Sequence, residues 1–419
     1  MKHVLLSLRT IFRFKTYTGI NIAGLALSLA CVFILVRYIH QEMTVNHFVP
    51  DLDRTFLTTV VYNTGRVNLS ESLDESKNPD YLSLVADPSV ERYSRFIMQE
   101  EDFVLIDEYR YTVNTLVVDS SFFQLIPYPC LEGTMQLAPN DALISEEFAK
   151  KIFGKKSPIG KGMTVSTGNV VRIVGVVGKP ATKSSFQFDA LNQKLAKPMK
   201  LETYMDQAVY FQLLPLEDIY FNREISSYAK AILRGNKDVL RLLGLVSGLI
   251  LLVGLFNYVN LYTVMMQKRG KELGVKQVFG ANRLQVFLQL YAENVCLNSI
   301  ALFFVWLFIE LTRNVMDSTF GIPVQSDVCF DWLLSGSVLF VLPLLTVLYP
   351  FWKYTHASPI HSLRSVFVGG KSLTSRFVFL FFQYVITFCL VVAAIYLSRQ
   401  LYFLLHTDVG YKTDHIIYC

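Results

Sequence analysis

Long apolar stretches alternate with polar segments along this chain of 419 residues. Five stretches carry few or no charged residues, and each is long enough for the roughly 20 residues that a helix needs to cross a bilayer. They lie at 16–36, 242–266, 284–309, 332–352 and 377–398. The pattern therefore predicts five membrane-spanning helices.

The first apolar stretch has the basic flank of a cleaved signal peptide, because four Lys and Arg residues precede it. Its 21 uncharged residues exceed the apolar core of about 7–15 residues usual in such peptides. Cys31 resembles the cysteine of a lipoprotein cleavage site, but Ser28 stands where a large aliphatic residue is expected. We interpret the stretch as an uncleaved membrane anchor.

The polar segment at 40–238 has the length of an ordinary domain, about 200 residues. RYTVNTLVVD (110–119) alternates apolar and polar residues and is rich in β-branched residues, as a half-buried strand should be, and NVVRIVGVVGKP (169–180) has strand character too. SEEFAKKIFG (145–154) predicts a short helix that begins at a serine and ends at a glycine. The polar run at 66–80 favours a loop. Together these patterns predict an α+β domain between the first two spans.

Composition and charge agree with a membrane protein. Only 17% of the residues are charged and 52% are hydrophobic, whereas soluble domains carry about 25% charged residues. Lys and Arg gather before the first stretch, at 267–283 and at 353–376, while 310–331 has one Arg and four acidic residues. Because basic residues favour the cytoplasmic side, the N-terminus is predicted inside and the α+β domain outside.

Recognisable catalytic or metal-binding patterns are absent from the sequence. The six cysteines occur singly, with no CxxC pair and no Cys/His cluster. GKKSPIGKG (154–162) resembles a phosphate loop, but its spacing is wrong and Gly162 replaces the required Ser or Thr, so we interpret it as a structural turn. No GxSxG or HExxH motif occurs either. The sequence therefore predicts a chain that is not an enzyme and binds no cofactor itself.

Several polar and small residues fall inside the predicted spans. Gly244 and Gly248 have the spacing that lets two helices approach closely, although such pairs also occur by chance. Asn257 and Asn260 need polar partners on neighbouring helices. Glu293 is costly in a bilayer; a proton relay is one interpretation, and a paired or neutralised packing residue is the one we favour.

The segment QKRGKELGVKQVFGA (267–281) separates the second and third stretches, and we expect it to form a short amphipathic helix on the inner face. Glu272 and Lys276 are placed for an i,i+4 ion pair. A topological anchor would explain the basic residues but not the apolar ones, which favour contact with lipid headgroups or a partner groove. The candidate contact residues are Lys268, Arg269, Lys271, Glu272, Leu273, Gly274, Val275, Lys276, Val278, Phe279 and Gly280.

This segment resembles the MacB/FtsX-type ABC transporter permeases, whose pattern has a basic residue, Glu, Ile or Leu, Gly, a basic residue and a terminal Gly-Ala. ALISEEFAKKIFGKKSPIGKGM (142–163) and VRIVGVVGKP (171–180) resemble the MacB-like periplasmic core domain. QEMTVNHFVPDLDRTF (41–56) is similar to the segment after the first span, with Asn46 and Thr55 where Asp and Tyr are more typical.

The resemblance implies a multi-pass inner-membrane permease subunit that works with a separate cytoplasmic ABC ATPase through the 268–280 helix. ATP and Mg²⁺ are then expected in that partner, because no Walker A motif occurs in this chain. A homodimer or a pseudo-dimer of two halves is expected, together with membrane lipid and a periplasmic adaptor, and no nucleic acid. Members of the family serve efflux, lipoprotein release or cell-envelope regulation.

The fifth stretch departs from the family's four-span pattern. We interpret the chain either as the first part of a duplicated eight-span permease or as a five-span variant. The expected divisions are 1–39 (inner terminus and first span), 40–238 (external core domain), 239–352 (permease domain), 353–376 (inner linker) and 377–419 (fifth span and the start of a second external domain). A membrane sensor with an external ligand-binding domain is the alternative function; a secondary transporter fits less well because almost half the chain is external.

Overall fold

The computed structural model describes residues 15–61, 67–69, 86–119, 121–186, 188–192, 210–223, 232–320, 327–355 and 370–407. The chain forms two compact units, one of Tyr38–Arg241 and one of Met1–Arg37 with Leu242–Cys419. Below, the first is the external unit and the second the helical unit. The predicted domain boundaries at 40 and 238 lie within a few residues of this division.

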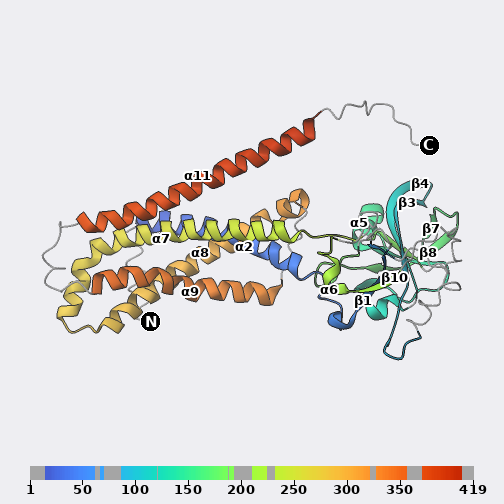
Figure 1. Ribbon diagram of the computed structural model, residues 1–419, viewed down its shortest axis with the longest axis horizontal. Coiled ribbons are helices and arrows are strands. Elements are labelled where there is room, and N and C mark those ends of the chain that lie inside the picture. Colours follow the sequence, from blue (N-terminus) through green and yellow to red (C-terminus); the bar gives the residue numbers. More distant parts are fainter. Residues whose placement is uncertain are drawn as a thin grey trace. The chain divides into compact units, whose positions relative to one another are not determined.

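The external unit is an α+β domain, as the sequence predicts (Figure 1). A small sheet has the order β10-β1-β2, and a larger one has the order β5-β8-β6-β9-β4-β3-β7. Because β7 also pairs with β8, the larger sheet closes back on itself. The strands are β1 (Phe56–Val61), β2 (Val67–Leu69), β3 (Phe96–Ile106), β4 (Tyr109–Val118), β5 (Cys130–Gly133), β6 (Asp141–Ser145), β7 (Gly162–Val165), β8 (Val170–Val177), β9 (Ala190–Asn192) and β10 (Tyr210–Pro215).

Local predictions for the external unit are confirmed with one correction. The predicted helix is α5 (Glu146–Phe153): the Ser145 side chain accepts a hydrogen bond from the backbone of Phe148, and Gly154 ends the helix with φ 62°. The strands β4 and β8 occupy the predicted ranges. The end of β4 is buried on both faces rather than alternating, because it lies inside the closed sheet. Apart from β2, most of the predicted 66–80 loop lies outside the described residues.

Two apolar cores fill the external unit. One joins β4, β6 and β8 to the short helices α4 (Phe122–Leu125) and α6 (Leu216–Ile219), with Leu116 and Phe122 among its most buried members. The other lies under α5 and holds residues such as Ile144 and Met163. The GKKSPIGKG segment closes the second core as a turn, where Gly160 has φ 82° and its N–H bonds the carbonyl of Ile173 at 2.8 Å.

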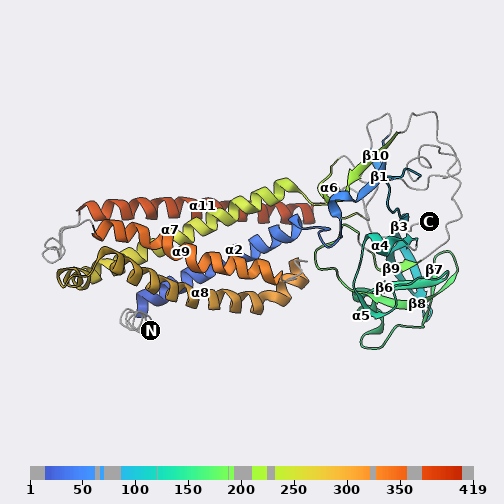
Figure 2. The same ribbon diagram turned by 90° about the horizontal axis from the view of Figure 1, so that it is seen from below.

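Among the described residues, the helical unit has five helices that are long and apolar enough to span a membrane, as the sequence predicts. They are α2 (Lys15–Met43), α7 (Lys237–Val278), α8 (Arg283–Phe320), α9 (Val328–Thr355) and α11 (Gly370–His406). Figures 1 and 2 show α2, α7, α8 and α9 running alongside one another. The span of α11 has no residue buried inside the chain, in contrast to the other four.

The predicted separate helix after the second span is wrong. Instead α7 continues without a break through 42 residues, so that 267–278 is its last three turns. Gly274 lowers helix propensity by only about 1 kcal/mol relative to Ala, and the segment contains no proline. Contacts with α8, described below, hold this end of α7 in helical form.

Small residues do bring two helices together, but not the pair that the sequence singled out. A Cβ atom on Gly254 would lie 2.6 Å from the Cβ of Ser28, and one on Gly24 would lie 2.9 Å from Nδ2 of Asn257. Each of these glycines therefore leaves room for a side chain of the facing helix, which lets α2 and α7 pack closely. A Cβ on Gly248 meets no atom within 4 Å, so this glycine takes no part in that contact.

Candidate functional site

A tight turn joins α7 to α8, and its sequence explains its shape. Gly280 adopts φ 88° just after α7, and the N–H of Ala281 bonds the carbonyl of Lys276 at 2.9 Å, which is the Schellman arrangement of helix ends. Asn282 then begins α8: its side chain accepts from the N–H of Leu284, and Gln285 accepts from the N–H of Asn282. Gly280 thus ends α7.

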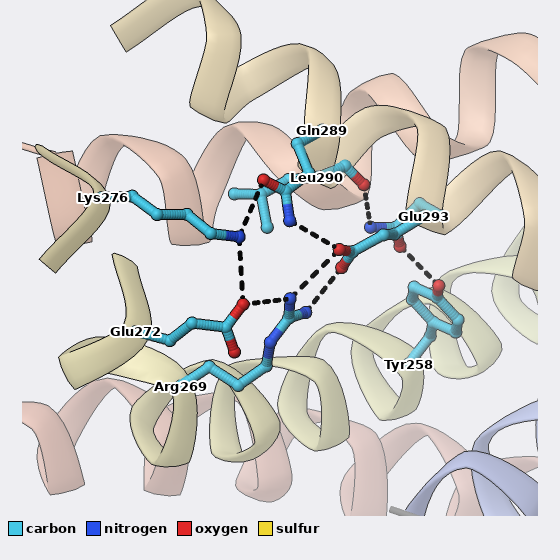
Figure 3. A network of polar contacts seen from close by, with 8 residues as sticks. Tyr258, Arg269, Glu272, Lys276, Gln289, Leu290 and Glu293 are labelled. Atoms are coloured by element: carbon cyan, nitrogen blue, oxygen red, sulfur yellow. Dashed lines mark hydrogen bonds and ion pairs between the residues drawn. The ribbon is translucent and has the colours of Figure 1, made fainter. Parts of the chain in front are cut away.

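A buried ion pair joins the two helices near this turn. Arg269 on α7 donates to both carboxylate oxygens of Glu293 on α8, over 2.5 and 3.0 Å (Figure 3). Their side chains are only 2% and 4% exposed. Such a two-pronged contact satisfies a buried carboxylate that would otherwise be costly. Glu293 is therefore paired, as the interpretation that we favoured expects.

Further side chains extend this pair toward the surface. Gln289 donates to Glu293 over 3.0 Å and accepts from Lys276 over 3.2 Å, and Lys276 also bonds Glu272 over 3.0 Å. The predicted i,i+4 pair of Glu272 and Lys276 is confirmed. Partial burial would raise the pKa of Glu272, but the hydrogen bond from Lys276 and the charges of Arg269 and Lys276 lower it below its ordinary value. The described charged side chains of this segment, Arg269, Glu272 and Lys276, are thus paired within the chain.

No pattern in the sequence predicts Arg269 inside the helices, where the structure places it. It is buried against Glu293, whereas Val275, Val278 and Phe279 of the same candidate set are exposed. One signal could have found the pair: Arg269 and Glu293 each lie twelve residues from Ala281. In an antiparallel helix hairpin, residues equally far from the turn lie at the same level.

Polar residues deeper in the helices have mixed environments. The hydroxyl of Tyr258 donates to Asn294 over 2.5 Å, a pair that the sequence analysis missed. Asn260 is buried, but its Nδ2 atom has no hydrogen-bond partner within the part of the chain that the structure describes, so the predicted polar partner is not found there for that atom. Asn257 lies against Gly24 of α2.

A second ion pair lies at the other end of the helices, and the sequence analysis missed it as well. Arg37 of α2 bonds Asp331 of α9 over 3.1 Å and lies 5.6 Å from the ring centre of Trp306 on α8. The Trp306 ring nitrogen donates to Ser335 of α9 over 3.2 Å. These contacts join three helices at the end opposite Gly280.

Several exposed apolar side chains lie on the outer surface of the α7–α8 turn, beside the exposed polar residues Asn282, Arg283 and Gln285. Val278 and Phe279 are 62% and 86% exposed, and Val275, Leu284 and Leu288 are exposed too. We call these five residues the hairpin tip. Gly274 is buried. The side chains of Lys268, Lys271 and Leu273 lie outside the described residues. The predicted apolar side of this segment is therefore present, while its described charged side chains are paired with one another or buried.

Within the described residues, no group of three or more His, Cys, Asp or Glu side chains is arranged to hold a metal ion. The features that the site does offer are the exposed apolar side chains of the hairpin tip and the buried ion pair of Arg269 and Glu293 beneath them.

Two family models match this chain. The MacB-like periplasmic core domain matches residues 18–219, and the FtsX-like permease C-terminal domain matches residues 244–359. The second match contains α7, its turn into α8 and most of the helical unit described above.

Two curated proteins are similar to parts of the chain. A Bacillus subtilis protein described as an uncharacterized ABC transporter permease, YknZ, is 26% identical over 181 residues, or 38% of this chain and 45% of that protein. The macrolide export ATP-binding/permease protein MacB of Marinobacter nauticus is 23% identical over 270 residues, or 57% of this chain and 41% of that protein. The chain thus covers less than half the length of either relative.

Among solved structures, the periplasmic region of MacB from Actinobacillus actinomycetemcomitans is 13% identical, with a TM-score of 0.28 over 48% of this chain and 87% of that one. The first family match covers most of α2 and most of the external unit, and the second lies within the helical unit. The chain belongs to the MacB/FtsX family of ABC transporter permeases and is a multi-pass membrane protein.

Proposed function

We propose that this chain is the permease subunit of an ABC transporter of the inner membrane and that a separate cytoplasmic ATPase binds its hairpin tip. The N-terminus and the hairpin tip then lie in the cytoplasm, and the external unit lies outside. ATP hydrolysis in the partner would drive conformational change in the external unit, in export, lipoprotein release or regulation of the cell envelope.

The exposed apolar surface of the hairpin tip carries this proposal. Phe279 and Val278 are more exposed than apolar side chains usually are in water, and they are placed on a turn that is itself well ordered by capping contacts. Among the described side chains near the tip, Arg269, Glu272, Lys276 and Glu293 are paired with one another, so a partner gains contact area without having to separate these pairs. Exposed apolar side chains on such a turn can pack into an apolar groove on another protein.

The basic segments support the proposed orientation. Lys and Arg are concentrated at 267–283 and 353–376, and 310–331 is acidic on balance. Asp331 and Arg37 are paired with each other at the end opposite the hairpin tip, so neither contributes net charge there. The bias of basic residues toward the cytoplasm then places the hairpin tip inside.

Binding of the ATPase can be tested by substitution at the tip. Val278→Asp and Phe279→Asp should each reduce co-purification of an ATPase encoded beside this gene, because a carboxylate would have to be desolvated in the contact. Val170→Asp is a matched control, since Val170 is as exposed as Val278 but lies on β8 of the external unit. Capture of the ATPase at wild-type levels by both tip variants would refute the proposed contact.

A further inference from the structure

The two segments of chain that leave the external unit meet a buried polar cluster within it. The last turn of α2, from Tyr38 to Met43, and the first turn of α7 both belong to this unit. We call the cluster the junction clamp; its members are Glu42, Asn46, Lys183, Ser185 and Tyr220.

Glu42 lies in the last turn of α2 and is buried. Its carboxylate bonds the Nζ atom of Lys183 over 2.5 Å and accepts a hydrogen bond from the hydroxyl of Tyr220. Lys183 also donates to the Tyr220 hydroxyl over 2.9 Å, so each of the three side chains contacts the other two. Because Lys183 and Tyr220 lie far from Glu42 in the sequence, these contacts attach the end of α2 to the rest of the external unit.

Asn46 strengthens the same attachment three residues after α2 ends. Its Nδ2 donates to the Ser185 hydroxyl over 2.7 Å and to the carbonyl of Leu216 over 3.3 Å, while its Oδ1 accepts from the N–H of Ser185 over 2.8 Å. Its φ of 66° is left-handed, which asparagine tolerates better than most residues. An ionised Asp, more typical here in similar permeases, could not donate to Leu216.

The segment that leads into α7 binds the same residues. The N–H of Leu233 bonds the carbonyl of Ser185 over 2.9 Å, and the N–H of Gly235 bonds the carbonyl of Tyr220 over 2.8 Å. A Cβ on Gly235 would lie 2.2 Å from the Tyr220 ring, so only glycine can approach it this closely. Tyr220 and Ser185 therefore contact both the segment around the end of α2 and the segment that leads into α7.

We propose that Glu42, Lys183 and Tyr220 are positioning residues that hold the end of α2 and the start of α7 at a fixed separation on the external unit. The two helices then deliver a movement to this unit as a pair, not independently. This inference deepens the proposed function and rests on it for the source of the movement, whereas the fixed separation can be measured without any ATPase.

The separation can be measured with spin labels on the full chain in detergent. In a background without cysteine, labels replace Met43 at the end of α2 and Val239 at the start of α7, both of which are exposed. Pulsed dipolar spectroscopy should give one narrow distance in the otherwise unchanged protein. Lys183→Met leaves Glu42 buried without its cation, and we expect it to abolish the single narrow distance.

Two further variants keep the test decisive. Tyr220→Phe removes one hydroxyl but keeps the ring against Gly235, so the protein should fold and still lose the narrow distance; it replaces Lys183→Met if that variant does not fold. Arg223→Met breaks the ion pair with Asp238 at the start of α7, whose side chains are 66% and 61% exposed, and should leave the distance narrow. Retention of the narrow distance in folded Tyr220→Phe and Lys183→Met proteins would overturn the proposal.

The same samples separate this inference from the proposed function. Failure of the tip variants to weaken ATPase capture would refute the contact at the hairpin tip without changing the measured distance. A distance that stays narrow in the clamp variants, with ATPase capture lost in Val278→Asp, would refute the junction clamp alone.

Discussion

Removal of Arg269 tests whether the buried ion pair holds α7 to α8. Arg269→Met keeps a long apolar stem but leaves the carboxylate of Glu293 buried, with only Gln289 among its described hydrogen-bond donors. The double variant Arg269→Met/Glu293→Leu removes both charges and keeps apolar volume. The comparison of the two separates the cost of an unpaired charge from the cost of altered packing.

The structure sets the expected size of the effect. Both side chains are almost fully buried and share two hydrogen bonds, so loss of one partner should cost about 3–5 kcal/mol. The double variant should lie within about 1 kcal/mol of the unchanged protein, because apolar replacement of a buried ion pair is often neutral. Arg313→Met is a matched control on α8: its pair with Glu310 is solvent-exposed and should contribute below about 1 kcal/mol.

Tryptophan fluorescence during unfolding in detergent mixtures provides the assay. All three tryptophans of the chain lie on α8 and α9, so the signal reports the helical unit and not the external one. An Arg269→Met protein as stable as Arg313→Met would refute the assigned role of the pair. A double variant as unstable as the single one would show that packing, not the unpaired carboxylate, causes the loss.

Three further outcomes follow from contacts elsewhere. Gly254→Ala should destabilise the helical unit by about 1–3 kcal/mol, because its Cβ would clash with α2, whereas Gly248→Ala should be neutral or slightly stabilising by the same fluorescence assay. Ser145→Ala removes the cap of α5 and should cost about 1 kcal/mol, seen as faster amide hydrogen exchange in that helix. Burial, with a hydrogen bond to a carboxylate, raises the pKa of Tyr220 far above its usual value. Such a group stabilises the fold below its unfolded pKa of about 10, and this stabilisation is lost as the pH rises further. The free energy of unfolding should therefore fall less steeply above pH ~10 in Tyr220→Phe than in the unchanged protein.

Hydropathy predicted the helices because a bilayer-spanning segment must be apolar along its whole length, whatever its neighbours are. The cap of α5 was also predictable, since Ser145 and Gly154 act on backbone atoms a few residues away. The closed order of the larger sheet was not, because its pairings join distant segments, as in the parallel contact of β4 with β9.

The candidate site was predicted as a surface but not as a network. The apolar side of the segment could be read from Val275, Val278 and Phe279, whose exposure is confirmed. Arg269 was placed outward because it lies in a basic run, and hydrophobicity does not distinguish a solvated arginine from one with a buried partner. Its partner Glu293 lies on another helix, so only the geometry of the hairpin brings the two together.

The position of the buried pair limits how a protein bound at the hairpin tip can act on the helices. Arg269 lies nine residues before Val278, or about 14 Å along α7 at 1.5 Å per residue. Tilting α7 away from α8 at the tip would separate this pair, at a cost of about 3–5 kcal/mol, while Lys276 and Gln289 resist the same motion nearer the turn. Moving both helices together breaks none of these contacts. We therefore expect a force applied at the hairpin tip to displace α7 and α8 as one body. Any bending should be confined to the parts of the two helices that lie farther from the turn than Arg269 and Glu293.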